Sequence, residues 1–340
     1  MAVQELSASA KLANVLTQDI AQRAPQSFAG MAFAHLRRDR LTLAALFIII
    51  TLALCALFAP LLASLDPNLT NPDHAYAPAY VVPYISWRLG IDAQTAPILL
   101  GKYSGSVHWL GADNLGRDQF SRLLYGGRIS LSIAFVAALV SMFIGVLVGG
   151  TAGYFGGRVD DFFMWVLNTV NSVPTIYLLI TICAIFTPSP TVLILFLGLL
   201  GWFGTARFMR GNVLKVRTLD YALAARATGA THWRILLSHI IPNSLPVIIV
   251  ITAIDVGSLI LTESTLSFIG LGVQPPSPTW GNMLNRARDL FFLRDPVTKA
   301  FTAFHLMWPP GLLISLSVLC FYLIGDGLRD ALDPMMKNKK

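Results

Sequence analysis

The chain has 340 residues, of which 55% are hydrophobic and only 13% are charged. Soluble domains carry about 25% charged residues, so the composition excludes an ordinary soluble enzyme and a disordered chain. It also argues against a nucleic-acid-binding protein, despite a net charge of +7 and a pI of 9.5. The three cysteines, Cys55, Cys183 and Cys320, lie far apart in apolar stretches. That pattern indicates packing rather than a disulfide framework or a metal site.

Charge-free runs of about 20 residues predict membrane-spanning helices, because the hydrocarbon core is about 30 Å thick and a helix rises about 1.5 Å per residue. One run, 162–206, is too long for a single crossing, and the turn signal at 187–190 divides it. Pro309 and Pro310 are expected to mark the start of the last helix. The six predicted spans lie between Arg40 and Asp66 (41–65), between Arg128 and Arg158, at 162–186, 190–206 and 245–269, and between Lys299 and Asp326.

These spans predict an all-α, polytopic membrane protein with six transmembrane helices in a lipid bilayer. Six crossings place both termini on one side. Lys and Arg are more numerous on that side, and Arg37, Arg38 and Arg40 flank the first span, so both termini are expected to be cytoplasmic. The first apolar run begins about forty residues into the chain and is too long for a signal-peptide core, so we expect an uncleaved anchor. The polar tails are 1–40 and 337–340.

A long external loop, 66–128, is predicted between the first two spans. Its first part is rich in Pro and Asn, which argues against a long helix or a paired strand. In its second part Asp113 is a candidate N-cap, and Asp118 stands four residues before Arg122. We expect an amphipathic helix on the outer face here. The alternative is a connector that packs there without contacting a substrate.

The loop between the fourth and fifth spans, about 210–243, has a helix–Gly–helix pattern. Asp220 can start a first helix and Gly229 breaks it, whereas a second helix is predicted over 231–241, ending before Pro242 and Pro246. Four alanines keep the first helix slim, which would let the groove of another protein approach its backbone. A docking element and a plain cytoplasmic hairpin explain this pattern equally well.

Two other patterns interrupt the apolar spans. Asn171 and neighbouring polar residues precede Pro174, which is expected to kink the third span. These polar groups either satisfy carbonyls freed by the kink or line a path. Gly145, Gly149 and Gly153 recur every four residues in the second span and predict close helix packing, with gating as the alternative.

The helix–Gly–helix loop resembles a known motif. Residues 221–229 (YALAARATG), followed by 239–243 (HIIPN), are similar to the EAA coupling motif of ABC importer permeases, and the separation of Gly229 from Pro242 fits it. One position departs from the motif, because Leu223 replaces the glutamate that gives it its name. A salt bridge from that glutamate is therefore not expected.

Three further stretches narrow the resemblance to the second, C-type permease of the dipeptide/oligopeptide/nickel family. Residues 108–118 (HWLGADNLGRD) resemble the HPLGTDxLGRD segment, with Trp109 and Ala112 replacing Pro and Thr. Residues 266–284 and 325–334 are similar to the blocks after the fifth span and at the C-terminus. The stretch 66–107 departs from the short loop of that family and looks like an insertion.

The resemblance implies a five-helix permease core, 129–336, preceded by one extra helix in the inner membrane. It implies a homologous second permease, two ATPase subunits below and an extracytoplasmic binding protein above. Di- or oligopeptides are the expected substrates, with nickel or oligosaccharides as alternatives. The residues expected to contact the ATPases are Asp220, Tyr221, Ala224, Ala225, Arg226, Gly229, Arg234, His239 and Pro242.

Asp255 and Glu263 are ionisable residues inside the fifth span. Such groups are costly in hydrocarbon and normally face the interior of a bundle. Their spacing of eight residues is expected to bring both near one helical face, where they would line the path with Asn171 and contact a peptide amine or another cation. The alternative is an interhelical hydrogen bond or a protonated carboxyl.

The chain has no phosphate-binding loop, because Lys102 is followed by Tyr103 and no Gly stands five residues earlier. We therefore expect no catalysis, cofactor or metal in this chain, with ATP and Mg²⁺ bound by the partner ATPases. Two other classes compete with the importer. An intramembrane protease would need Asp255 and Asp326 as a pair, and an autonomous channel or secondary transporter would show inverted repeats.

Overall fold

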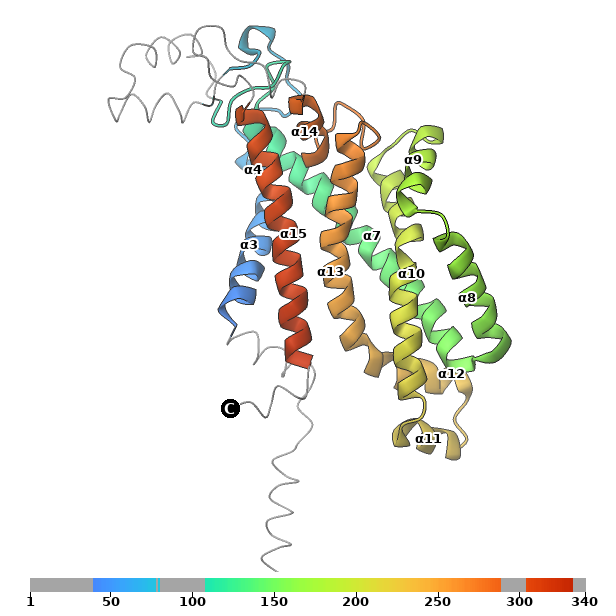
Figure 1. Ribbon diagram of the computed structural model, residues 1–340. Coiled ribbons are helices and arrows are strands. Elements are labelled where there is room, and N and C mark those ends of the chain that lie inside the picture. Colours follow the sequence, from blue (N-terminus) through green and yellow to red (C-terminus); the bar gives the residue numbers. More distant parts are fainter. Residues whose placement is uncertain (1–38, 78, 80–107, 289–303, 333–340) are drawn as a thin grey trace, which may run out of the picture.

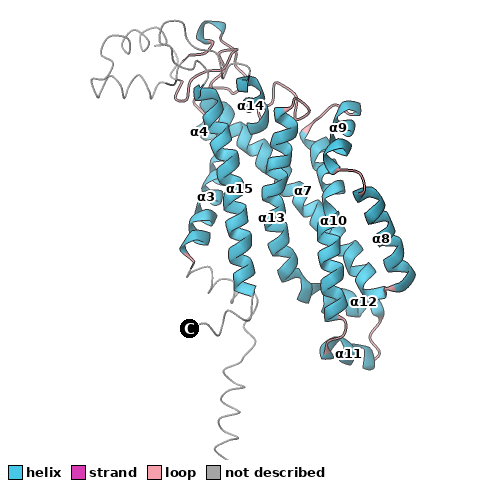
Figure 2. Cartoon of the chain, in the orientation of Figure 1, coloured by secondary structure: helices cyan, strands magenta, loops and turns pink. Residues whose placement is uncertain are grey.

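The computed structural model describes residues 39–77, 79, 108–288 and 304–332, and every named element within them is a helix (Figures 1 and 2). Residues 1–38 of the predicted tail 1–40, the whole predicted tail 337–340 and most of the 66–107 insertion lie outside the described residues. In chain order the elements are α3 (Arg40–Leu57), α4 (Ala59–Leu62), η1 (Pro72–His74), α7 (Gln119–Phe155), α8 (Gly157–Asn171), α9 (Thr175–Ile185), α10 (Pro190–Val216), α11 (Asp220–Ala227), α12 (His232–Ile235), the π-helical segment η2 (Leu236–Ile240), α13 (Ile241–Phe268), α14 (Trp280–Arg288) and α15 (Phe304–Leu332).

Five helical segments are long and apolar enough to cross a membrane: α3, α7, α10, α12 through α13, and α15. The pair α8 and α9 also passes this test together, although it is bent by 74°. Counted as one broken span, this pair brings the number to the predicted six. The expectation of a polytopic all-α membrane protein is confirmed.

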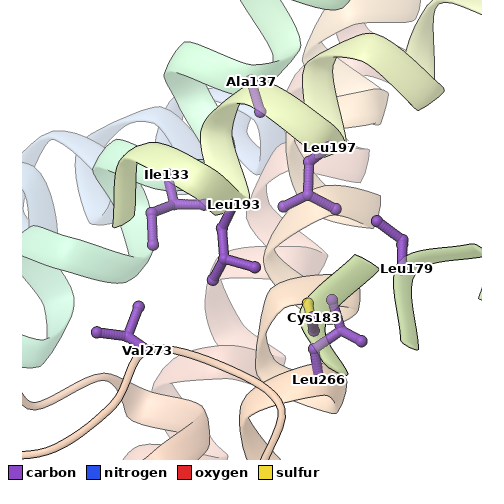
Figure 3. Packing of buried hydrophobic residues seen from close by; sticks show 8 residues of the cluster. All are labelled: Ile133, Ala137, Leu179, Cys183, Leu193, Leu197, Leu266 and Val273. Carbon is purple, nitrogen blue, oxygen red and sulfur yellow. The ribbon is translucent and has the colours of Figure 1, made fainter. Parts of the chain in front are cut away.

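The third predicted span, 162–186, is not one straight helix. Pro174 supplies no N–H, and α9 begins directly after it, so the kink predicted there is a complete break. Beyond the break α9 turns back against the bundle (Figure 1). Leu179 and Cys183 of α9 then join a buried cluster with Ile133 of α7 and Leu193 of α10 (Figure 3).

The most extensive helix pair is α7 with α10, and the predicted glycine face of α7 forms it. A Cβ at Gly145 would come within 2.6 Å of the Thr205 side chain, and one at Gly153 within 2.9 Å of the Arg210 carbonyl oxygen. A Cβ at Gly149 would come closer still to a neighbour, the backbone oxygen of Ala206. These contacts confirm the packing interpretation, because side chains at the three positions would force the helices apart.

The bundle has two ends, the loop end and the elbow end (Figure 1). The loop end carries α4, η1, residues 108–118 and α14. The elbow end carries the elbow, defined as residues 220–242, together with the start of α3 and the end of α15.

The predicted amphipathic helix before the second span is not a separate element. Asp118, not Asp113, caps α7 by accepting a hydrogen bond from the Ser121 N–H, and the helix then runs unbroken for 37 residues. Asp113 instead accepts from the backbone N–H groups of Leu115 and Arg117 and closes a turn. The apolar residues after Asp118 therefore belong to the span itself.

The last helix begins earlier than predicted, since Pro309 and Pro310 lie inside α15 rather than at its start. Pro310 cannot donate to the Leu306 carbonyl oxygen four residues before it. The Nε2 of Gln119 on α7 donates to that oxygen instead, at 3.0 Å. A side chain from a neighbouring helix thus compensates for the missing backbone donor.

Candidate functional site

The elbow is built from local signals that the sequence shows clearly. The first helix, α11, begins at Asp220 as predicted, and Gly229 ends it with a φ of +82°, a left-handed conformation that glycine adopts without strain. Thr231 then caps α12 by accepting a hydrogen bond from the Arg234 N–H. The predicted helix–Gly–helix element is therefore present.

The second elbow helix does not end before Pro242 and Pro246. It continues through η2 into α13, so that one helical segment runs from His232 to Phe268. Side-chain donors reach carbonyls beside the prolines: the Nδ2 of Asn243 donates to the His239 oxygen at 2.7 Å. The π turn, in which the Ile241 N–H donates to the Leu236 oxygen, shifts the hydrogen-bond pattern just before Pro242, and the helix continues past both prolines. The elbow is consequently joined rigidly to a membrane span.

Several contacts hold the elbow against the ends of α7 and α10. The Arg217 Nη1 donates to the carbonyl oxygen of Gly153 at 2.8 Å, which satisfies the open C-terminus of α7. The Tyr154 hydroxyl lies 3.0 Å from the His232 Nδ1. Ala222 is buried, so α11 rests on the bundle through its smallest side chains.

The outward side of the elbow carries most of the predicted coupling residues. Asp220, Tyr221, Ala224, Arg226, Gly229, Arg234 and Pro242 are exposed, whereas Ala225 and His239 are half-buried. Leu223, which stands where the motif has glutamate, is 46% exposed. Beside it lies an open hollow of about 440 Å³ lined by Tyr154, Phe155, Arg217, Thr218, Leu223, Arg226 and His232.

Asp255 lies on the wall of a cavity of about 220 Å³ between α7, α9, α10 and α13. Ser141, Thr175, Ser258 and Thr262 contribute hydroxyl groups to the same wall. The nearest recorded hydrogen-bond donor to the carboxylate is the Thr205 hydroxyl, at the long distance of 3.5 Å. This carboxylate can therefore still accept from a ligand.

Glu263 does not share that cavity. Its side chain is 0% exposed, and it accepts hydrogen bonds from Ser130 at 3.0 Å and from Ser267 at 2.7 Å. Eight residues of helix turn through about 80° beyond two full rotations, so the two carboxylates point in different directions. The interpretation of Glu263 as a path-lining residue is replaced by the alternative, an interhelical hydrogen bond.

Asn171 is exposed at the end of α8, next to the break before α9. With its amide oriented for hydrogen bonding, its oxygen accepts from Arg207 of α10 at 3.1 Å. Asn168 accepts from the same guanidinium, also at 3.1 Å. Asn171 therefore joins α8 to α10 and lies apart from the Asp255 cavity.

The loop end contains a buried polar network that the sequence patterns did not reveal. His108 lies 3.0 Å from both the Asp118 carboxylate and the ring of His74, so three side chains form a chain of hydrogen bonds. Burial acts to raise the pKa of Asp118, but hydrogen bonds from His108 and Ser121 outweigh it and hold that pKa below 3.8. The one feature of the sequence that pointed to this network was the cluster of polar residues in 108–118.

Two known families match the chain. The family described as binding-protein-dependent transport system inner membrane component matches residues 141–338. The N-terminal TM domain of oligopeptide transport permease C matches residues 27–79. The first match begins within α7 and continues through α10, the elbow and α13 to α15, so it includes the elbow and the residues that line the Asp255 cavity.

Three curated relatives extend these matches. The dipeptide transport system permease protein of Bacillus subtilis (strain 168) is 34% identical over 94% of this chain and 89% of the relative. The glutathione transport system permease protein of Pectobacterium atrosepticum is 42% identical over 70% and 76%, respectively. The nickel transport system permease protein of Escherichia coli (strain K12) is 35% identical over 73% and 87%. The chain therefore belongs to the family of binding-protein-dependent transport system inner membrane components, and it is a transmembrane permease subunit of an ABC importer.

Proposed function

We propose that this permease forms half of the translocation path of an ATP-driven importer for di- or oligopeptides. A homologous second permease would complete the path, two ATPase subunits would drive it, and an extracytoplasmic binding protein would deliver the substrate. Relatives named for dipeptide and glutathione transport support a peptide substrate, since glutathione is itself a tripeptide. The nickel relative keeps nickel as the second candidate.

The exposed elbow carries this proposal. It projects between two spans, presents apolar and basic side chains outward, and continues without a break into α13. A protein that grips the elbow can therefore move α13, and with it the wall that holds Asp255, as a rigid body. The ATPases would bind ATP and Mg²⁺, and their closure shifts the permease only if their contacts with the elbow differ between its two states.

The proposed topology places the elbow end in the cytoplasm. Basic residues gather there, among them Arg40, Lys215, Arg226, Arg234 and Arg329, in agreement with the excess of Lys and Arg on cytoplasmic loops. Both termini would then be cytoplasmic, and the loop end would face the binding protein.

Asp255 is the proposed contact for the amino group of the peptide in the path. Its carboxylate faces a cavity lined by hydroxyl groups, and an ammonium group donates to both kinds of oxygen. Asp255→Asn is expected to reduce uptake of peptides with a free amino terminus about tenfold and to leave N-acetylated peptides unaffected. Equal uptake of both peptides by the Asn variant and the wild type would remove Asp255 from the path.

The elbow is tested in the complete importer, purified with its partners and placed in liposomes. Ala224→Trp puts a bulky side chain on the exposed face of α11, and Ala184→Trp makes the same change on the exposed face of α9. We expect Ala224→Trp to lose the ATPase subunits during purification and to lower substrate-stimulated ATP hydrolysis more than tenfold. Ala184→Trp should retain both. An Ala224→Trp complex with normal assembly and hydrolysis contradicts the coupling role, and uptake of nickel but not of dipeptide contradicts the substrate class.

A further inference from the structure

A second polar hollow lies at the loop end, away from the Asp255 cavity. Its volume is about 410 Å³, and it is bounded by α14, by the turn after α13 and by the loop before α7. Its wall carries a guanidinium group and four side-chain amides: Arg286, Asn114, Gln274, Asn282 and Asn285. Such a lining suits a small ligand with both a charge and peptide-like groups.

The residues around this hollow carry more positive than negative charge. Asp113 forms an ion pair with Arg117 at 2.5 Å and lies 3.7 Å from the Nε of Arg122, and all three side chains are buried. Arg286 borders the small gap beside Asp113 and Arg122 as well as the hollow. One carboxylate thus faces three guanidinium groups, and burial together with the charge of Arg117 lowers the pKa of Arg286.

Arg286 itself is half-buried and makes no hydrogen bond or ion pair with any described residue. This is unusual for a group with five N–H donors, which normally pairs when it loses water. Glu263 does not neutralise it, because that carboxylate is 0% exposed and accepts from Ser267 beneath the hollow. The charge of Arg286 is therefore available to a ligand.

The helix that presents Arg286 is held firmly. Asn282 donates to the carbonyl oxygens of Val273 and Ser277, and the indole N–H of Trp280 donates to the Leu123 oxygen at 3.0 Å. Arg286 therefore points from a fixed platform, which limits the entropy lost when a ligand binds.

The amides of the wall have a defined orientation. The Nε2 of Gln274 donates to the Gly272 oxygen at 3.0 Å, and the Nδ2 of Asn285 donates to the Phe268 oxygen at 2.5 Å. Their amide oxygens accept no recorded hydrogen bond from the described residues. They can therefore accept N–H groups from the backbone of a bound peptide.

We propose that this hollow is a binding site for the C-terminal carboxylate of the transported peptide, with Arg286 as the residue that selects for a free carboxylate. The planar guanidinium matches a carboxylate with two parallel hydrogen bonds. The site would receive the peptide at the mouth of the path, before its amino group reaches Asp255. This inference rests on the proposed peptide substrate.

The test compares a dipeptide that has a free C-terminal carboxylate with its C-terminal amide, using the complete importer in liposomes. Arg286→Gln removes the charge at nearly constant volume, and Arg288→Gln removes the same charge from the same helix at an exposed position. Arg286→Gln should fold, because no described residue depends on Arg286 as a partner, and recovery of the assembled complex checks this. Each variant is compared with the wild type for each peptide, so the preference of the binding protein cancels.

We expect Arg286→Gln to lower uptake of the free acid about tenfold and to leave uptake of the amide unchanged. Arg288→Gln should change the uptake of neither peptide. Arg286→Lys should restore part of the uptake, because lysine keeps the positive charge but cannot make two parallel hydrogen bonds to the carboxylate. An equal loss for acid and amide overturns the proposal, since Arg286 would then act in delivery by the binding protein. No loss for either peptide also overturns it. A wild-type importer that takes up neither peptide contradicts the proposed function and this inference with it.

Discussion

The two ends of the bundle are held together by different interactions. At the loop end Asp113, Arg117 and Arg122 form ion pairs with at most 7% of each side chain exposed, and His108 and Asp118 are buried beside them. At the elbow end α11 contributes a single buried side chain, that of Ala222, and leaves large apolar groups in the open. The exposed apolar residues of and beside α11 are Leu219, Tyr221 and Leu223.

This difference indicates that the loop end is rigid and that the elbow can move. Buried ion pairs resist movement because separating them leaves charges without partners in a medium of low dielectric constant. The elbow has few such bonds to break, and its exposed apolar surface matches what a partner protein covers. In the proposed importer the loop end would stay fixed around the substrate while the elbow moves with the ATPase subunits.

The largest predicted effect comes from removing the carboxylate at the centre of the loop end. Asp113→Ala leaves the guanidinium groups of Arg117 and Arg122 buried without their ion-pair partner, which costs about 3–5 kcal/mol of stability. Asp220→Ala removes an exposed carboxylate from the first turn of α11 and should cost less than about 1 kcal/mol. Thermal unfolding of the purified complexes in detergent measures both. Equal losses would contradict the contrast between the two ends.

The next effect concerns Glu263, which joins α13 to α7. Glu263→Ala leaves the hydroxyl groups of Ser130 and Ser267 without their acceptor and opens a cavity, at a cost of about 2–3 kcal/mol. Glu263→Gln keeps an acceptor oxygen, so it should unfold within about 1 kcal/mol of the wild type and transport normally. A folded Gln variant that no longer takes up substrates with a free amino group, but still takes up other substrates, would show that Glu263 lines the path.

The membrane spans were predictable because their signal is local. A charge-free run of about 20 residues has one favourable arrangement in a bilayer, and α3, α7, α10 and α13 all follow such runs. Proline was the weaker guide. The helix end predicted before Pro242 and the helix start predicted at Pro310 were both wrong, since each proline lies inside a helical segment. Within a span the side chain of a neighbouring helix can supply the hydrogen bond that a proline cannot make, as Gln119 does at Pro310.

The sites divide in the same way. The first elbow helix starts at Asp220 and is ended by Gly229 through local backbone preferences, which the sequence shows directly. The ion pair of Arg210 with Asp160 at 2.6 Å joins residues 50 positions apart, and no local pattern predicts it. The separation of Asp255 from Glu263 also depends on which neighbouring helix each one meets.

A smaller effect tests the backbone of the elbow. A Cβ at Gly229 or at Gly211 meets no atom within 4 Å, so the two positions differ in conformation rather than in space. Gly229→Ala forces a left-handed conformation on alanine, at a cost of about 1–2 kcal/mol, and should lower substrate-stimulated ATP hydrolysis. Gly211→Ala lies in α10 and should stabilise it by about 0.5–1 kcal/mol. The thermal midpoints of the two variants should therefore move in opposite directions from the wild type, and a shift in the same direction contradicts the strain argument.

The smallest effect concerns the response of the loop end to acid. Because the pKa of Asp118 is lower in the folded chain than its ordinary value of 3.8, the folded state favours the ionised carboxylate. The resulting stability is complete above pH 3.8 and is lost as the pH falls through the lower, folded-state value. Ser121→Ala removes the hydroxyl donor at 2.7 Å and should bring the pKa of Asp118 closer to 3.8.

The measurement is the thermal midpoint of the purified complex between pH 3 and pH 6, taken as the difference between each variant and the wild type. Other carboxylates titrate in this range, but they contribute equally and cancel in the difference. Ser172→Ala, which removes an exposed hydroxyl at the end of α8, serves as the control. The gap between Ser121→Ala and the wild type should be constant above about pH 5 and narrow as the pH falls below 3.8, because protonation removes the advantage that Ser121 helps to create. A gap that stays constant to pH 3 would mean that Ser121 stabilises the loop end through its contact with Leu65 rather than through the charge of Asp118.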